Sequence, residues 1–220
     1  MCGRYTLTAP AEVLTEIFDV RESVELAPRY NVAPTQDVAV VGLNHEGDRT
    51  LGTMRWGLIP SWAKDPSIGN RLINARSETA AEKPAFRSSF QKRRCLVLAD
   101  GFYEWKKVPG GKQPYYIQLH GHRPFAFAGL WSRWHKGEGE PIVSCTLLTT
   151  TPNEVTAEVH DRMPVILPAE AYAAWLSPDT PTEELQALCK PYPASEMETY
   201  PVSKLVNSPK NDLPQCLDPA

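Results

Sequence analysis

The chain has 220 residues, a length that fits a single domain, since domains usually hold roughly 100 to 200 residues. Hydrophobic residues make up 42% of the sequence and charged residues 22%, a balance that excludes disorder as the main state. The formal net charge of −3 excludes a strongly basic protein and gives no general sign of nucleic-acid binding.

The first predicted element is a helix over residues 11–18. Its apolar residues Val13, Leu14, Ile17 and Phe18 have the i, i+1, i+4, i+5 spacing of a helix with one buried stripe. Segments rich in β-branched and aromatic residues then predict strands over 38–41, 50–56, 95–99, 115–119, 125–130, 142–148 and 163–167. Further short helices are predicted around Pro84 and over 168–175 and 182–188.

The 21 prolines exceed the average usage of about 5% and have no period, which favours many short elements joined by fixed turns. We therefore predict the α+β class, with a mixed, strongly curved, barrel-like sheet and short flanking helices. No repeat and no disordered linker divides the sequence, so we expect one domain over 1–220. The tail from about residue 209 is expected to pack loosely.

No stretch approaches the ~18 apolar residues of a membrane span, and the N-terminal segment lacks the apolar core of a signal peptide. The five cysteines are odd in number and form no CxxC pair, so neither a disulfide framework nor a zinc site is indicated. The histidines have no metal-ligand spacing with them. We expect a cytoplasmic protein without membrane contact, metal or cofactor.

Cys2 could carry chemistry, because removal of Met1 would leave one residue with both a free α-amine and a thiol. Reference pKa values of about 7.7 to 8.0 and about 8.5 leave both groups partly nucleophilic near neutrality. An aldehyde could form a Schiff base with the nitrogen, and the sulfur could then close a five-membered thiazolidine. Alternatively, the thiol could attack an amide with the amine as base, or Cys2 could be a small residue at an accessible terminus.

Three further segments combine polar and apolar residues in ways that suit catalysis. Asn74 lies between apolar Ile73 and a predicted helix, where it could cap the helix or position an amine or oxyanion. Glu104 lies between Tyr103 and Trp105, where a low dielectric would raise its pKa toward that of a general acid; a solvent-facing strand is the alternative. His160 precedes an apolar strand and is either structural or a proton-transfer group.

Six segments in order, MCGRYTL, RYNVAPT, RWGLIPSWAK, LINARSET, ADGFYEWKK and HDRMPVIL, closely resemble the SRAP family of SOS response associated peptidases, or abasic-site processing proteins. The later YPVSKLVN is similar to the C-terminal strand and turn of that family. The resemblance implies a mixed barrel-like fold that binds single-stranded DNA in the response to DNA damage. It also implies a covalent thiazolidine crosslink between mature Cys2 and the ring-opened abasic deoxyribose, which would shield the lesion.

The resemblance assigns catalytic roles to four residues. Glu104 would move protons during ring opening and Schiff-base formation, His160 would help protonate the sugar oxygen, and Asn74 would orient the amine of Cys2. The family name reflects proposed self-removal of the leading residue, although an aminopeptidase could also remove Met1 from this chain. The residues expected to bind DNA through phosphate contact, wedging or base stacking are Arg4, Asn31, Pro34, Trp62, Arg76, Trp105, Thr149 and Arg162.

Three functions remain open from the sequence. The first is a monomeric abasic-site crosslinking enzyme that needs the thiol and the free amine of Cys2, and that is nucleoid-associated when bound to DNA in a bacterium. The second is a thiol peptidase or amidohydrolase that uses Cys2 and His160 and turns over peptides without DNA. The third is a noncatalytic protein that recognises damaged single-stranded DNA, and its complex would dissociate in high salt and in denaturant.

Overall fold

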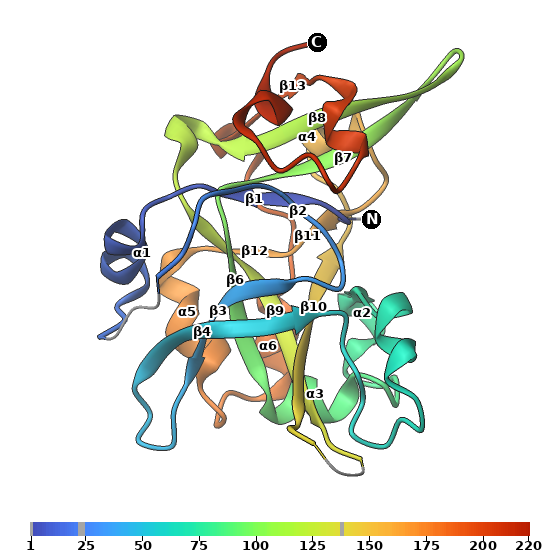
Figure 1. Ribbon diagram of the computed structural model, residues 1–220. Helices are drawn as coiled ribbons and strands as arrows, with labels where there is room; N and C mark the ends of the chain where they lie inside the picture. The colour runs from blue at the N-terminus through green and yellow to red at the C-terminus, as the bar shows by residue number, and fades with distance from the viewer. Residues whose placement is uncertain (1, 22–24, 137–138) are drawn as a thin grey trace.

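The computed structural model describes residues 2–21, 25–136 and 139–220. Two β-sheets dominate the architecture, with short helices on their outer sides (Figure 1). Met1, whose removal would free the amine of Cys2, lies outside the described residues. The predicted α+β class and barrel-like core are confirmed.

Five strands of the larger sheet form a closed barrel. Strand β10 pairs with both β4 and β9, and the ring runs β10–β4–β3–β6–β9 and back to β10. The β10–β4 pair is parallel, and the other pairs of the ring are antiparallel. The barrel strands are β3 (Asp37–Leu43), β4 (Arg49–Trp56), β6 (Arg94–Ala99), β9 (Phe125–Trp134) and β10 (Ile142–Thr150).

Three short strands extend the barrel at its edges: β5 (Asn74–Arg76), β11 (Met163–Pro164) and β12 (Ile166–Leu167). The sequence predicted one strand over 163–167, but the chain here changes partners, from β10 to β9. Val165 lies between the two short strands, where its N–H donates to Leu148 O at 2.8 Å and its carbonyl accepts from Ala128 N at 2.9 Å. The predicted strand is therefore split in two.

The second sheet is open and antiparallel, in the order β13–β8–β7–β1–β2. Its strands are β1 (Tyr5–Leu7), β2 (Arg29–Val32), β7 (Gly101–Val108), β8 (Gly111–Leu119) and β13 (Met197–Pro201). Strand β7 follows β6 after Asp100, so the chain passes there from the barrel into the second sheet. The strand that carries Glu104 is therefore separate from the apolar strand before it.

The predicted helix over 11–18 is confirmed as α1 (Ala11–Phe18), which buries Leu14 and Phe18. The remaining α-helices are α2 (Ser77–Ala80), α3 (Arg87–Lys92), α4 (Glu154–Ala157), α5 (Tyr172–Leu176) and α6 (Thr182–Leu188). Short 3-10 helices are η1 (Pro66–Arg71), η2 (His120–His122), η3 (Ala169–Ala171), η4 (Ala194–Glu196), η5 (Lys204–Asn207) and η6 (Pro214–Leu217). No described helix is long and apolar enough to cross a membrane.

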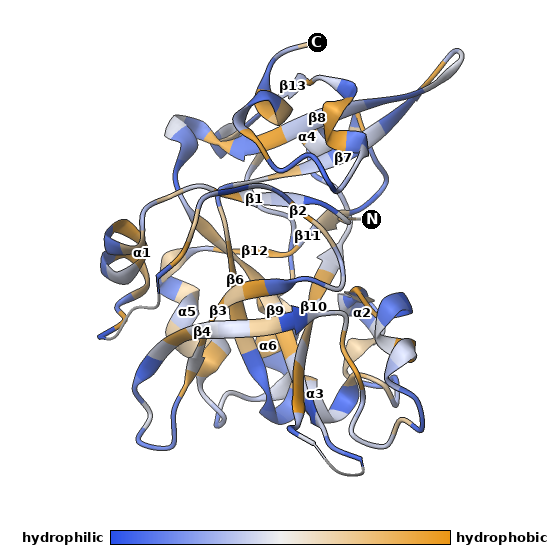
Figure 2. Ribbon diagram, in the orientation of Figure 1, coloured by the Kyte–Doolittle hydropathy of each residue, from blue (hydrophilic) through white to orange (hydrophobic). Residues whose placement is uncertain are grey.

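One apolar core joins the two sheets. Tyr5 of the second sheet packs between Trp56 and Phe127 of the barrel, with ring centroids 5.3 Å and 5.7 Å apart. All three side chains are fully buried or nearly so. Figure 2 shows apolar residues along β9 and β10, which contribute to this core. Strand β1 is therefore held on its barrel side by aromatic packing.

Polar contacts fix β1 at its other end. The carboxylate of buried Asp100 accepts hydrogen bonds from Thr6 Oγ1 at 2.5 Å and from Thr8 Oγ1 at 2.7 Å. Gly101 lets the ring of Tyr116 cross β7, because a Cβ at this glycine would lie 2.0 Å from the Tyr116 hydroxyl oxygen. These contacts hold the strand that directly follows Cys2.

The tail from about residue 209, which was expected to pack loosely, makes specific polar contacts with the second sheet. The carboxylate of Asp212 accepts hydrogen bonds from the backbone N–H of Tyr30 and Asn31 and forms an ion pair with Arg29. Cys216 is fully buried beside Tyr103 and Tyr116. Polar residues in the tail therefore satisfy the edge of β2, a role that composition alone does not indicate.

Candidate functional site

The four predicted catalytic residues come from four different segments. Cys2 precedes β1, Asn74 begins β5, Glu104 lies on β7, and His160 lies between α4 and β11. Strands β1 and β7 belong to the second sheet, whereas β5 and β11 both pair with β10 of the barrel. The site therefore lies where the two sheets meet, beside the start of the chain.

Asn74 contacts Cys2 directly. Its Nδ2 donates a hydrogen bond to the carbonyl oxygen of Cys2 at 2.7 Å. Its Oδ1 is buried and has no hydrogen-bond partner among the described residues. A buried acceptor without a partner costs free energy, so this oxygen is available to a nearby donor.

The thiol of Cys2 is completely buried. Burial raises its pKa well above the usual range, and the charge of Glu104 acts in the same direction. The Sγ atom lies 3.8 Å from the carbonyl oxygen of Arg4. The sulfur is therefore held as a thiol, and its reaction requires removal of the proton by another group.

Glu104 is a buried carboxyl group, so of the two alternatives left open by the sequence the solvent-facing one does not hold. Burial raises its pKa to about 7, because a low dielectric disfavours the carboxylate. Its Oε2 atom lies 3.9 Å from His160 Nε2. At neutral pH this carboxyl group can both donate and accept a proton.

His160 is partly exposed, and burial lowers its pKa, with the charge of Lys112 acting in the same direction. Its Nδ1 lies 2.9 Å from the carboxylate of Asp161 and 3.1 Å from the backbone N of Arg162. The second ring nitrogen faces Glu104, so the imidazole connects the buried carboxyl group with the molecular surface.

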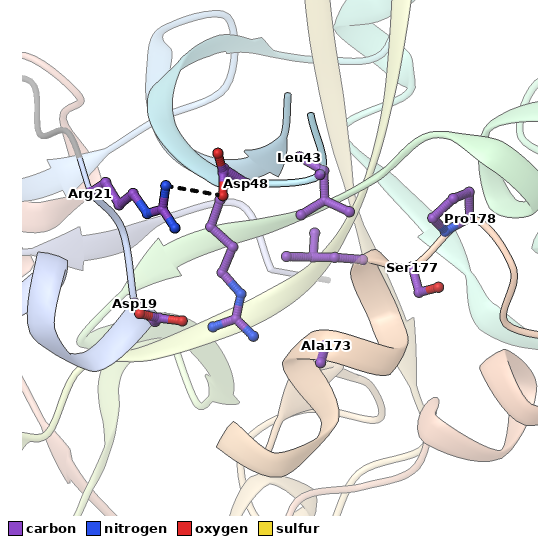
Figure 3. A pocket seen from close by; sticks show the side chains of 10 residues that line it. Asp19, Arg21, Leu43, Asp48, Ala173, Ser177 and Pro178 are labelled. Carbon is purple, nitrogen blue, oxygen red and sulfur yellow. Dashed lines mark ion pairs between the residues drawn. The ribbon is translucent and has the colours of Figure 1, made fainter. Parts of the chain in front are cut away.

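An open cleft of about 680 Å³ borders Glu104 and His160. Residues 104–107 and Lys112 of the β7–β8 hairpin line it on one side, and residues 158–161 line it on the other. A second hollow, of about 370 Å³, lies among the segment after α1, the β3–β4 turn and α5, and contains no predicted site residue (Figure 3). An Arg21–Asp48 ion pair of 3.5 Å crosses it. The cleft beside Glu104 is therefore the one that matches the predicted chemistry.

Four of the residues predicted to bind DNA have accessible surface. Trp62 is 57% exposed, Arg76 is exposed at the end of β5, and Pro34 and Trp105 are half-buried. The indole N–H of Trp105 donates to Asn207 Oδ1 at 2.7 Å, which fixes the plane of the ring. These side chains can reach a ligand without unfolding.

Two predicted DNA contacts, Asn31 and Thr149, are buried, with 0% and 1% of their surface exposed. The amide of Asn31 donates to carbonyl oxygens of the C-terminal segment, including Asn211 O at 2.7 Å. Thr149 packs within β10 and accepts from the guanidinium of Arg162. In this conformation both residues support the fold, and neither presents its side chain to DNA.

The two remaining arginines are already bonded within the protein. Arg4 donates to Asn31 Oδ1 at 3.0 Å and to Val206 O at 2.7 Å, with its guanidinium 5.9 Å from the centroid of the Trp105 ring. Arg162 makes a bidentate pair with Glu78 at 2.6 Å and 2.8 Å, which lowers the pKa of Glu78. Local sequence patterns could not indicate the contact between Arg162 and Glu78, because the two residues are 84 positions apart.

Sequence reasoning also missed the polar residues that support the site. Asp100 anchors β1, Asn207 orients Trp105, and three lysines line the cleft beside Glu104. The sequence around these lysines is typical of a solvent-facing strand end. Only the register of β7 with β8 brings the three lysines to one cleft. Among the described residues, no group of three or more His, Cys, Asp or Glu side chains is placed to hold a metal ion.

The closed barrel and the second sheet define an α+β protein with a cluster of polar residues at the junction of the two sheets, beside Cys2. The family described as SOS response associated peptidase (SRAP) matches residues 1–209, and the chain belongs to this family.

Relatives and solved structures agree with the family and the fold. The chain is 47% identical to the abasic site processing protein YoqW of Bacillus subtilis, over 99% of each chain. It is 32% identical to the abasic site processing protein HMCES of Rattus norvegicus, over the whole chain and 76% of the relative. A crystal structure of a protein from Bacteroides thetaiotaomicron, 27% identical, superposes with a TM-score of 0.90 over 100% of both chains.

Proposed function

We propose that this protein processes abasic sites in single-stranded DNA by forming a covalent bond through Cys2 after Met1 has been removed. The convergence of Cys2, Asn74 and Glu104 at the junction of the two sheets carries this proposal. The printed names of the relatives, abasic site processing proteins, supply the substrate class.

The reaction begins with the α-amine of mature Cys2 and the aldehyde carbon of a ring-opened abasic deoxyribose. The nitrogen attacks this carbon, the carbonyl oxygen leaves as water, and a carbon–nitrogen double bond forms. The thiol then adds across that bond, with sulfur joining carbon and the proton passing to nitrogen. The product is a thiazolidine, and the net change is the loss of one water molecule.

Glu104 and His160 supply the proton transfers. The carboxyl group of Glu104, with a pKa of about 7, can donate a proton for sugar opening and accept one from the thiol. His160 lies 3.9 Å from it and reaches the cleft, so the imidazole can relay that proton to the sugar oxygen or to solvent. A carboxyl group that was always protonated could not accept the thiol proton, and one that was always ionised could not donate a proton for sugar opening.

Asn74 positions the amine. Its Nδ2 holds the Cys2 carbonyl at 2.7 Å, and its unpartnered Oδ1 can accept a hydrogen bond from the mature amine. A hydrogen bond of this kind orients the nitrogen lone pair toward the incoming aldehyde carbon. On this basis Asn74→Ala lowers the crosslinking rate while leaving DNA affinity within about twofold.

The DNA strand would approach over the exposed side chains of Trp62 and Arg76 and the half-buried Trp105. Aromatic stacking contributes about 1 to 3 kcal/mol per base, so two tryptophans offset the unfavourable net charge of −3. The expected setting is the cytoplasm, in association with DNA, and the expected state is a monomer.

Intact mass spectrometry before and after incubation with an oligonucleotide that bears an abasic site tests the proposal. We expect loss of Met1 and an adduct equal to the oligonucleotide minus one water, stable in a denaturing gel without borohydride. Cys2→Ser should give a less durable product. Cys189→Ser, at a half-buried cysteine outside the site, is the matched control and should react like the parent chain.

A mature Cys2 terminus that forms no adduct would rule out the covalent reaction. Peptide turnover in the absence of DNA would then favour a thiol peptidase, and salt-sensitive binding without an adduct would favour a noncatalytic reader. The buried, high-pKa thiol of Cys2 fits the stepwise amine-first route better than direct thiolate attack on a peptide.

A further inference from the structure

The β7–β8 hairpin extends well beyond the rest of the second sheet (Figure 1). Pro109 and Gly110 form its turn, and Gly110 and Gly111 have φ angles of +83° and +152° that side-chain-bearing residues rarely adopt. The hairpin begins at the buried Glu104 region and ends in solvent, so one continuous ribbon connects the candidate site with the surrounding solution.

Three lysines gather along this ribbon. Lys106 and Lys107 on β7 and Lys112 on β8 line the cleft that also contains Glu104 and His160. Lys107 and Lys112 are directly opposite each other in the strand register. Like charges in that position destabilise a hairpin, so their presence needs a reason other than stability.

No acidic group among the described residues compensates these lysines by an ion pair, whereas several arginines have such partners. Lys106 has an aromatic contact instead, with its ammonium 5.8 Å from the centroid of the Tyr115 ring. Burial lowers the pKa of His160, and the charge of Lys112, which lines the same cleft, acts in the same direction. The ribbon therefore presents uncompensated positive charge next to the reactive groups.

The opposite wall of the cleft is acidic at Glu158 and Asp161, and Asp161 is engaged with His160 at 2.9 Å. A polyanion in the cleft would be repelled by this wall and drawn toward the lysines. Trp105 also lines this cleft and is half-buried, so part of its indole is accessible to a base. Positive charge and an aromatic side chain along one wall are the features that track a single nucleic-acid strand.

We propose that the β7–β8 hairpin holds the sugar-phosphate backbone of the single strand that flanks the abasic nucleotide, through phosphate contacts of Lys107 and Lys112. The inference rests on the proposed function, which places the abasic nucleotide at Cys2. It adds a course for the flanking DNA that differs from the one marked by the arginines that the family resemblance assigns to DNA binding. Two of those arginines, Arg4 and Arg162, are already hydrogen-bonded within the protein, so more of the phosphate contacts must come from the lysines.

The test is the salt dependence of binding to an oligonucleotide that has no abasic site, so that no covalent capture can occur. Each phosphate contact on a single strand contributes about 0.7 to the slope of log K against log salt. The double variant Lys107→Gln/Lys112→Gln should reduce that slope by about 1.4 and weaken binding at low salt by about tenfold or more. Lys92→Gln/Lys190→Gln, at two exposed lysines outside the cleft, should match the parent chain.

Two results would overturn the hairpin proposal: an unchanged slope in the double variant, or an equal loss in the control pair. If both variants have the same melting temperature as the parent chain, damage to the fold is excluded as the cause of a change in binding. Crosslinking of the parent chain to an abasic oligonucleotide is measured in parallel. Its absence would refute the proposed function, whereas the salt slopes report on the hairpin alone.

Discussion

At the scale of single residues, burial acts on Glu104 and His160 in the same sense, since it favours the neutral form of each. The pKa of Glu104 rises to about 7 and that of His160 falls, so near neutral pH Glu104 changes readily between its two protonation states, with its Oε2 atom 3.9 Å from His160 Nε2. Ionisation of Glu104 lowers the stability of the folded state, because a carboxylate in that position is poorly solvated.

Glu104→Gln should therefore stabilise the protein at alkaline pH. The folded-state pKa of about 7 exceeds that of an unfolded glutamate, so the folded protein binds more protons between about pH 4.5 and 7 and loses stability as pH rises through this window. One pKa unit corresponds to about 1.4 kcal/mol, which gives a difference of about 3 kcal/mol at pH 8 that vanishes near pH 4.5. Urea unfolding of both proteins across this range measures it.

The exposed Glu82→Gln is the matched control and should leave the pH profile of stability unchanged. A stability difference between Glu104→Gln and the parent chain that stays constant with pH would contradict the pKa assignment. Crosslinking by Glu104→Gln should fall by at least about tenfold, because the amide cannot move a proton. A gain in stability together with a loss of activity is typical of a functional site.

Glu78 occupies the guanidinium of Arg162 with two hydrogen bonds, where a phosphate would otherwise bind. Glu78→Gln should strengthen single-strand binding by about 1 kcal/mol, or about fivefold, because it removes a competing carboxylate. Fluorescence anisotropy with a labelled oligonucleotide measures the change, with Glu46→Gln in the β3–β4 turn as control. Weaker binding would show that Glu78 holds Arg162 in its binding position instead of competing with DNA.

At the scale of elements, periodic segments were predictable and short pairing segments were not. Helix α1 matches the predicted range because its apolar residues repeat at helical spacing. Strands β1, β2 and β5 have three or four residues each and owe their conformation to distant partners, so no local pattern predicts them. Cys2 precedes β1, and Asn31 and Asn74 lie on β2 and β5, which is why resemblance, and not periodicity, pointed to the site.

The C-terminal tail is an element whose role can be tested by deletion. Removal of residues 210–220 takes away Asp212, which binds Tyr30 N at 2.6 Å, and the buried Cys216. The loss of these contacts should destabilise the protein by about 2 to 4 kcal/mol, in the range of large effects on a buried polar network. Thermal unfolding measures it, and Asp212→Ala should reproduce part of the loss. A melting temperature within about 1 °C of the parent value would show that the tail packs loosely and contributes little to stability.

At the scale of the whole molecule, the candidate site exists only while two sheets are joined. Glu104 belongs to the second sheet, whereas Asn74 and His160 depend on strands that pair with the barrel. Asn74 nevertheless reaches the Cys2 carbonyl at 2.7 Å, because Tyr5 anchors the start of the chain in the shared core. The geometry of the site is therefore a property of the interface between the sheets.

This dependence predicts that unfolding and loss of activity coincide. One apolar cluster contains residues of both sheets, including Tyr5 and Phe102 of the second and Trp56 and Phe127 of the barrel, so the sheets should unfold in one cooperative transition. Tryptophan fluorescence, far-ultraviolet circular dichroism and residual crosslinking, measured in the same urea series, should have one midpoint. Tyr5→Ala should shift all three midpoints together to lower urea. Separate midpoints would show that the second sheet opens while the barrel stays folded, and the site would then be lost before the fold.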